Sequence, residues 1–252
     1  MTFRADSYPY FDVPKPRVFA HRGLHTDYPE NTRGAFAAAL ATGVTHIETD
    51  VVASRDGIAM IAHDLRLNRL AGVDAAIGDK DAAALADIDL GGEGFITLRQ
   101  ALTEFPQVRF NIDVKDERAI EDVVDVVHDT DAHERVLVTS FSAARRRAVT
   151  AALPRVASSA SGTEFLRIWA AVILWITPPL PQIQALQIPE RAYGLRTVSK
   201  ALVEQYHRLG LEVHVWTVND AADMRRLLDL GVDGIVTDRA DIAMDVIRSR
   251  NS

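Results

Sequence analysis

Two histidines flank a pair of acidic residues in the first quarter of the chain. His21 and His63 each follow a short apolar run, and Glu48 and Asp50 stand two positions apart inside another. Histidine accepts and returns protons near neutral pH, whereas carboxylates inside an apolar strand are rare unless paired or bound to a cation. The sequence therefore predicts a site where two histidines act as acid and base beside a carboxylate pair.

A third carboxylate and two cationic residues complete this pattern. Asp113 and Lys115 end a later apolar run, and Arg22 follows the first histidine. Three converging carboxylates need a counter-ion, and all-oxygen ligation favours Mg²⁺ or Ca²⁺ over Zn²⁺. The alternative is that Arg22 and Lys115 neutralise the carboxylates by ion pairing. Arginine and lysine also bind phosphate, so the set predicts metal-assisted attack on a phosphate ester.

Three residues of the first loop are further candidates. Glu30 either orients Arg22 or contacts a substrate hydroxyl, and Asn31 is a candidate N-cap for the helix that follows. His25 is a weaker candidate for substrate contact. These assignments depend on how the loop is folded, which the sequence leaves open.

The chain alternates apolar strands with helices almost from end to end. We expect helices in several of the intervening segments, among them 32–41, 98–105, 117–128, 143–153, 199–209 and 221–230. The expected strands are 17–21, 45–51, 109–114, 136–140, 155–158, 184–188, 212–216 and 234–237. This alternation predicts a parallel sheet. Eight units in 252 residues favour an α/β fold of the (β/α)₈ TIM-barrel type over a doubly wound sheet, since no glycine-rich nucleotide-binding motif follows any strand. We expect one domain over 1–252, with its core at about 17–248.

Two segments interrupt the alternation. Residues 57–63 suggest a hairpin-like extended run, and 65–97 are irregular and predict an insertion or a long active-site loop. Phe165–Ile176 is almost wholly apolar, but it has about half of the roughly 20 residues that a membrane-spanning helix needs. We expect a buried barrel helix there. The alternative, which we do not favour, is an apolar lip at the barrel mouth that contacts lipid or a second subunit.

Composition excludes several classes of protein. The net charge of −7 and the lack of a basic stripe argue against a nucleic-acid partner. There is no cysteine, so disulfides and thiolate metal sites are excluded. The first residues lack the apolar core of a signal peptide. We therefore expect a soluble cytoplasmic protein that acts on a small molecule, with its oligomeric state left open.

The motifs, in their order, resemble those of the bacterial glycerophosphodiester phosphodiesterases. The matching segments are 21–23 (His-Arg-Gly), 29–32 (Pro-Glu-Asn-Thr), 48–51 (Glu-Thr-Asp-Val), 56–57 (Asp-Gly), 63–64 (His-Asp), 111–115 (Asn-Ile-Asp-Val-Lys), 215–219 and 231–238. The resemblance implies a TIM barrel with a small insertion after the second histidine, at about 65–97. It also implies hydrolysis of glycerophosphodiesters to glycerol 3-phosphate and an alcohol with Mg²⁺ or Ca²⁺.

The resemblance implies a role for each matching residue. His21 and His63 would be the acid/base pair, and Arg22 and Lys115 would hold the phosphate. Glu48, Asp50 and Asp113 would hold the metal, and Trp216 would lie against the glycerol. One departure is Asp113, where the usual bacterial motif has the longer glutamate.

A related enzyme acting on lysophospholipids is the nearest alternative, with Phe165–Ile176 receiving the acyl chain. A non-catalytic phosphate-binding barrel and a phospholipase C-like barrel are less favoured. Which histidine is the acid, and whether a cyclic phosphate forms, stay open.

Overall fold

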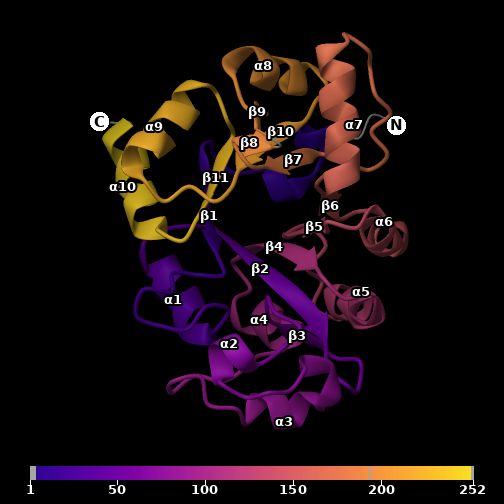
Figure 1. The fold of residues 1–252 in the computed structure, drawn as a ribbon, viewed down its shortest axis with the longest axis vertical. Helices are drawn as coiled ribbons and strands as arrows, with labels where there is room; N and C mark the ends of the chain where they lie inside the picture. The colour runs from indigo at the N-terminus through magenta and orange to yellow at the C-terminus, as the bar shows by residue number, and fades with distance from the viewer. Residues whose placement is uncertain (1–3, 193, 251–252) are drawn as a thin grey trace.

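In the computed structural model, which describes residues 4–192 and 194–250, eight parallel strands form a nearly closed barrel (Figure 1). The strands are β1 (Arg17–His21), β2 (His46–Ala53), β4 (Arg109–Val114), β5 (Val136–Thr139), β6 (Ala157–Ser158), β7 (Ala185–Ile188), β10 (Glu212–Val215) and β11 (Gly234–Thr237). Their order is β6-β5-β4-β2-β1-β11-β10-β7. The ring closes between β6 and β7, where Gln184 N donates to Ser158 O at 2.9 Å and Ser159 bridges Ala185. The predicted (β/α)₈ barrel is confirmed.

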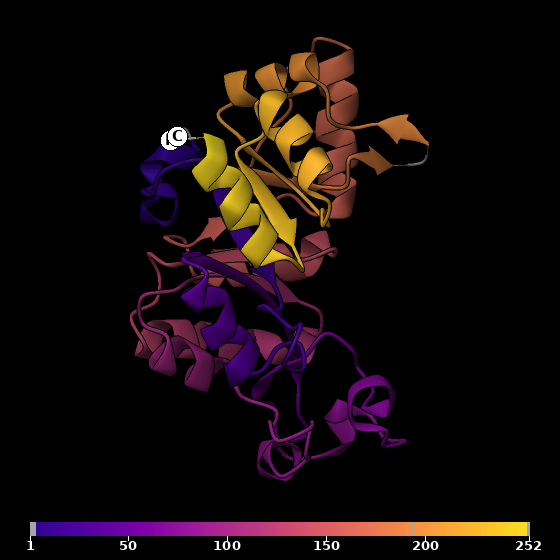
Figure 2. The same ribbon diagram turned by 90° about the vertical axis from the view of Figure 1, so that its left-hand side faces the viewer.

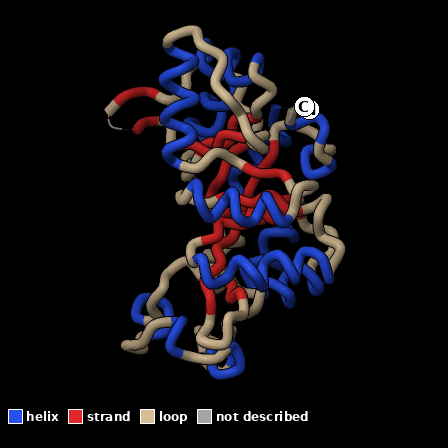
Figure 3. Tube along the Cα trace, turned by 90° about the vertical axis from the view of Figure 1, so that its right-hand side faces the viewer, coloured by secondary structure: helices blue, strands red, loops and turns tan. Residues whose placement is uncertain are grey.

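Helices surround the strands on the outside (Figure 3). They are α1 (Arg33–Ala41), α4 (Leu98–Glu104), α5 (Ile120–Asp129), α6 (Ala143–Ala152), α7 (Gly162–Ile173), α8 (Lys200–Arg208), α9 (Ala221–Asp229) and α10 (Ala240–Arg250). In α5, Val123, Val126 and Val127 form the buried stripe that helical periodicity produces. The expected cap of α1 was wrong, since Thr32 Oγ1 accepts from the Ala35 amide and Asn31 lies before the cap.

The N-terminal segment fills the end of the barrel lumen that lies opposite the C-terminal ends of the strands. Two short 3₁₀ helices, η1 (Ala5–Ser7) and η2 (Pro9–Phe11), precede β1. Tyr10 and Phe11 are buried and pack in one cluster with Phe19 of β1. The core therefore begins before residue 17, because these two aromatic rings close the end of the lumen opposite the strand C-termini.

The insertion forms a small unit at one end of the molecule (Figures 1 and 2). Strand β3 (Ala59–Ile61) pairs antiparallel with β2, as the hairpin-like pattern predicted. Helices α2 (Asn68–Ala71) and α3 (Ala82–Ala86) follow, with η3 (Ile77–Asp79) between them. The unit has an apolar cluster of its own: Val52, Met60, Ala62, Leu67, Ile77, Leu85, Leu90 and Phe95. This cluster explains how a segment without strand–helix alternation is ordered beside the barrel.

A second projection lies after β7. There β8 (Arg191–Ala192) and β9 (Leu195–Arg196) form a small hairpin that extends from the body of the protein (Figure 2).

The apolar segment Phe165–Ile176 divides into two parts. Phe165, Ile168 and Val172 of α7 are buried against the barrel, which confirms the expected barrel helix. The end of the segment is exposed, and Trp175 is 81% exposed. Because α7 runs back from the C-terminal end of β6, this exposed end lies toward the opposite side of the barrel and not at the mouth. Among the described helices, none is long and apolar enough to cross a membrane.

Candidate active site

A cavity of about 540 Å³ opens at the C-terminal ends of the barrel strands. The first-loop candidates His25, Glu30 and Asn31 do not line it, but all the other residues that the sequence assigned to the site do: His21, Arg22, Glu48, Asp50, His63, Asp113, Lys115 and Trp216. Barrel enzymes place their reactive groups at this end. The structure therefore brings together residues that are up to 195 positions apart in the sequence.

Strand register sets the positions of the carboxylates. His21 of β1 is paired with Glu48 of β2, and Asp50 of β2 is paired with Asp113 of β4. The alternation of side chains along a strand sends both acidic residues of β2 to the same face. Glu48, Asp50 and Asp113 are 8%, 2% and 5% exposed, so all three carboxylates are withdrawn from bulk solvent.

Two cations lie against these carboxylates. Lys115 Nζ is 2.7 Å from Asp113 Oδ2 and 3.0 Å from Asp50 Oδ1, and Arg22 Nε is 3.2 Å from Asp50 Oδ2. Burial raises the pKa of Glu48 well above its usual range, and repulsion from Asp50 and Asp113 adds to this effect. Burial also lowers the pKa of Lys115, but attraction to Asp50 and Asp113 outweighs it and raises the pKa overall.

The oxygen atoms of this cluster fit a hard cation. Glu48 Oε2, Asn111 Oδ1 and Asp113 Oδ1 are buried and accept no hydrogen bond within the described part of the chain. Buried oxygens without partners are costly, and a cation would satisfy them. Within residues 4–192 and 194–250, no group of three acidic or histidine side chains surrounds a common point where a metal ion could bind. The ammonium group of Lys115 instead lies between Asp50 and Asp113.

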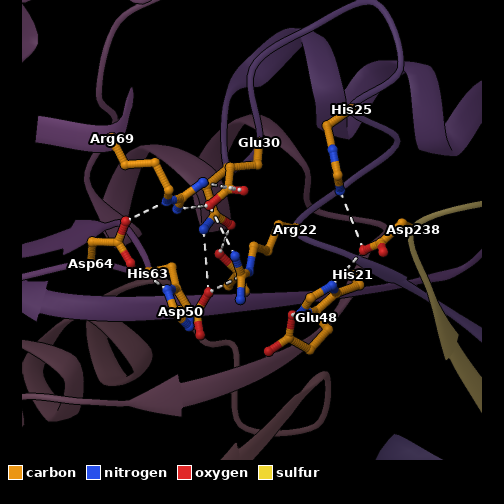
Figure 4. Close-up of polar contacts among 12 residues, drawn as sticks. His21, Arg22, His25, Glu30, Glu48, Asp50, His63, Asp64, Arg69 and Asp238 are labelled. Atoms are coloured by element: carbon orange, nitrogen blue, oxygen red, sulfur yellow. Dashed lines mark hydrogen bonds and ion pairs between the residues drawn. The ribbon is translucent and has the colours of Figure 1, made fainter. Parts of the chain in front are cut away.

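Each histidine of the site is bound to an aspartate (Figure 4). His21 Nδ1 lies 2.6 Å from Asp238 Oδ1, and His63 Nδ1 lies 2.6 Å from Asp64 Oδ1. A hydrogen bond at Nδ1 fixes the ring and leaves Nε2 for other partners. The sequence identified both histidines but gave no role to the aspartates, although Asp64 is adjacent to its histidine and Asp238 directly follows the last strand.

Asp238 is itself held by several groups. Asn219 Nδ2 donates to Asp238 Oδ2 at 2.7 Å, and His25 Nε2 lies 3.3 Å from Asp238 Oδ1. Burial raises the pKa of Asp238, but hydrogen bonds from His21 and His25 outweigh it and hold this pKa far below the usual range. The contact with Asp238 in turn raises the pKa of His25. His25 therefore supports Asp238, and it is not among the residues that line the cavity.

The loop after β1 is folded tightly around Arg22. Arg22 and Asn31 have φ angles of 58° and 60°, a region that few side chains adopt and that is enriched at functional sites. Arg22 N donates to Glu48 O at 2.8 Å, and Asn31 N donates to Arg22 O at 2.9 Å. Glu30 Oε1 accepts from Arg22 Nη1 at 3.0 Å. Glu30 thus orients Arg22, one of the two roles predicted for it. The side chain of Asn31 donates from Nδ2 to Asp50 Oδ2 at 3.3 Å.

The side of the cavity away from the carboxylates is largely apolar. Its residues include Phe141, Ala160, Phe165, Leu166, Ile188, Pro189, Ala192 and Trp216. Phe141 is 66% exposed, and its ring contacts both Trp216, at 6.2 Å between centroids, and Lys115 Nζ, at 5.8 Å. The cavity is therefore lined by charged side chains on one side and mainly by apolar side chains on the other.

Comparison with known proteins identifies the family. Residues 21–242 match the model of the glycerophosphoryl diester phosphodiesterase family. The chain belongs to this family of enzymes. A probable glycerophosphodiester phosphodiesterase of Mycobacterium tuberculosis is 40% identical over 246 residues, which cover 92% of this chain and 91% of that protein. The family resemblance stated from the motifs is therefore confirmed.

Solved structures and more distant relatives agree with this family. An Oleispira antarctica phosphodiesterase, solved in complex with the product sn-glycerol-3-phosphate, is 25% identical with a TM-score of 0.76 and covers 93% of this chain and 97% of its own. A Silicibacter pomeroyi structure at 23% identity has a TM-score of 0.79, over 99% of this chain and 97% of its own, and supports the fold. A mouse lysophospholipase D is 25% identical, over 88% of this chain and 83% of that protein.

Proposed function

We propose that this phosphodiesterase hydrolyses glycerophosphodiesters to glycerol 3-phosphate and an alcohol, with His21 and His63 as the acid/base pair and with Mg²⁺ or Ca²⁺. The observation that supports this proposal most strongly is one cavity that holds two aspartate-bound histidines together with buried carboxylate oxygens that accept no hydrogen bond from the described residues. The sn-glycerol-3-phosphate of the Oleispira antarctica neighbour supports the same choice of product.

The negative charge of the phosphate would be balanced by the side chains of Arg22 and Lys115. Arg22 and Lys115 line the cavity and would neutralise charge that develops on the phosphoryl oxygens, a contribution that needs only correct placement. Glu48, Asp50 and Asp113 would hold the cation, with Asn111 Oδ1 beside them. A bound cation supplies Lewis-acid polarisation of a phosphoryl oxygen and lowers the pKa of a bound hydroxyl.

The two histidines would exchange protons with the reacting oxygens. One histidine accepts at Nε2 a proton from the attacking oxygen, either of water or of the substrate's own hydroxyl, as the new bond to phosphorus forms. The other donates a proton to the alcohol oxygen as the bond between that oxygen and phosphorus breaks. Where the substrate hydroxyl attacks, a cyclic phosphate results, and water then opens it in a second displacement that gives glycerol 3-phosphate. Asp238 and Asp64 hold the opposite ring nitrogens throughout, so the imidazole rings keep their orientation. Trp216 would pack against the carbon atoms of the glycerol.

A direct assay tests this function. Purified protein is incubated with glycerophosphocholine and excess Mg²⁺ or Ca²⁺, and glycerol 3-phosphate is measured by a coupled dehydrogenase. We expect release that stops when EDTA is in excess and returns when the cation is restored. Absence of release with either cation would contradict the proposed substrate class.

A second candidate substrate is favoured by the apolar wall of the cavity. A lysophospholipid has the same phosphodiester and an acyl chain, for which Phe165, Leu166 and Ile188 offer apolar contacts. The relative named lysophospholipase D shows that proteins of similar sequence carry that name. Release of choline from lysophosphatidylcholine and from glycerophosphocholine, compared as kcat/KM, distinguishes the two substrates.

A further inference from the structure

Arg69 of the insertion contacts two acidic residues at the edge of the active site (Figure 4). Its Nη2 lies 2.6 Å from Glu30 Oε1, its Nη1 lies 3.0 Å from Glu30 Oε2, and its Nε lies 2.6 Å from Asp64 Oδ2. The same two carboxylates hold site residues, since Glu30 accepts from Arg22 at 3.0 Å and Asp64 holds His63 at 2.6 Å. The guanidinium of Arg69 therefore lies between Glu30, which contacts Arg22, and Asp64, which contacts His63.

We propose that Arg69 is a positioning residue that orients Arg22 through Glu30 and His63 through Asp64. This inference rests on the function proposed above, and it makes the insertion a part of the catalytic machinery. The planar guanidinium binds carboxylates through parallel hydrogen bonds of fixed direction, so it sets orientation as well as charge. A lysine at position 69 would keep the charge but would lack the fork that contacts both carboxylates at once.

Burial and charge explain why these contacts matter. The side chain of Glu30 is only 10% exposed, and its carboxylate is shared by two guanidinium groups that would repel each other without it. The side chain of Asp64 is 29% exposed, and in the part of the chain that the structure describes its carboxylate contacts Arg69 and His63. Loss of Arg69 would leave each carboxylate with one partner, free to rotate away from the geometry that holds Arg22 and His63.

The chain contains a matched control for this arginine. Arg55 and Asp81 also join the barrel to the insertion by a two-pronged contact, with Arg55 Nε 2.8 Å from Asp81 Oδ1. Neither residue lines the cavity. A variant of Arg55 therefore removes an arginine–carboxylate tie to the same insertion without touching the partners of Arg22 or His63.

Two measurements separate the effect of Arg69 on Glu30 from its effect on Asp64. Kd for glycerol 3-phosphate is measured by calorimetry, and kcat with glycerophosphocholine is measured on the same preparations with the divalent cation present. We expect Glu30→Gln to weaken product binding through Arg22, and Asp64→Asn to lower kcat through His63 with little change in Kd. Arg69→Met is expected to do both, with a roughly 10- to 100-fold loss of kcat, the usual scale for residues that orient a reactive group. Arg69→Lys should recover little of either, and Arg55→Met should match the wild type.

A double variant supplies a test that a purely structural role would fail. If Arg69 acts on kcat through Asp64, then Arg69→Met combined with Asp64→Asn should be no slower than the slower single variant. Equal kcat and Kd in Arg69→Met and Arg55→Met, or an equal drop in melting temperature with unchanged kcat, would overturn the inference. Lack of turnover by the wild type would instead contradict the proposed function, and the binding measurement would still decide the role of Arg69.

Discussion

The histidine at the end of the first barrel strand is held by the aspartate that follows the last. His21 Nδ1 lies 2.6 Å from Asp238 Oδ1, although 217 positions separate the two residues. The contact exists because β1 and β11 are neighbours in the closed barrel, with Ala20 paired to Thr237. The pairing of the first strand with the last therefore brings this histidine and this aspartate into contact.

Asp238→Asn is predicted to lower kcat for glycerophosphocholine by about 10²-fold, the lower end of what general acid–base catalysis contributes. An amide at this position can donate to Nδ1 instead of accepting from it, so the imidazole loses its fixed tautomer. Steady-state kinetics measure the effect. Asp241→Asn removes the partner of Arg239 at the surface and should leave kcat unchanged. Equal kcat in both variants would show that Asp238 does not position His21.

Glu48→Gln is predicted to abolish most activity and to shift cation dependence to at least about 10-fold higher concentration. The substitution removes a charge and preserves side-chain size, so it tests the carboxylate as a ligand. Because burial and two neighbouring carboxylates raise the pKa of Glu48, the uncharged amide should not destabilise the cation-free fold. Titration of activity with Mg²⁺ and Ca²⁺, beside thermal unfolding, measures both effects. The exposed Asp125 supplies the control Asp125→Asn, and equal cation curves for both variants would count against the site.

The two ends of the apolar segment are predicted to behave differently. Leu166 lines the cavity, so Leu166→Ser should lower kcat/KM for lysophosphatidylcholine by about 10-fold, which corresponds to about 1–2 kcal/mol of lost apolar contact. The same change should have little effect on glycerophosphocholine. Trp175 is exposed at the far end of the segment, so Trp175→Ser should change neither rate. Equal losses for both substrates in Leu166→Ser would argue against an acyl-chain site at this wall.

Local patterns in the sequence predicted most of the barrel and the centre of the site. Each strand was an apolar run ending in polar residues, and such runs lead to the active-site end of a parallel barrel. The spacing of two between Glu48 and Asp50 placed both carboxylates on one face, as the structure shows. These features depend on residues close together in the chain, which is why they could be recognised without a structure.

Contacts between distant segments could not be predicted in the same way. The partnership of Asp238 with His21 requires barrel closure, and that of Arg69 with Glu30 requires the folded insertion. The cap of α1 was misassigned to Asn31 because Asn and Thr are both common caps. The backbone of Asn31 has a positive φ, and its side chain donates a hydrogen bond to Asp50 of the carboxylate cluster.

Asp233 is predicted to make stability depend on pH in acid. Its carboxylate contacts Lys15 Nζ at 2.6 Å and His207 Nε2 at 2.7 Å. Burial raises the pKa of Asp233, but hydrogen bonds from His207 and Lys15 outweigh it and lower this pKa to about 2, from 3.8. A carboxyl whose folded pKa is depressed stabilises the fold above its unfolded pKa. This contribution is therefore complete above about pH 4 and is lost as the pH falls through about 2.

Asp233→Asn should then lower the free energy of unfolding by about 2 kcal/mol at pH 7 and flatten its decline between pH 4 and 2. Urea unfolding at pH 7, 4, 3 and 2 measures this. Asp229→Asn, which removes an exposed partner of Arg250, is the control. The idea fails if Asp233→Asn and the wild type lose stability in parallel across this range.

The most direct test of the account is release of glycerol 3-phosphate from glycerophosphocholine by the wild type and by His63→Ala, each with and without excess EDTA. The account predicts rapid release by the wild type with Mg²⁺ or Ca²⁺, none with EDTA, and a loss of about 10²- to 10⁴-fold in His63→Ala with the cation present. Release that continues in EDTA, or a His63→Ala variant as active as the wild type, would contradict the combined roles of the cation and the two histidines.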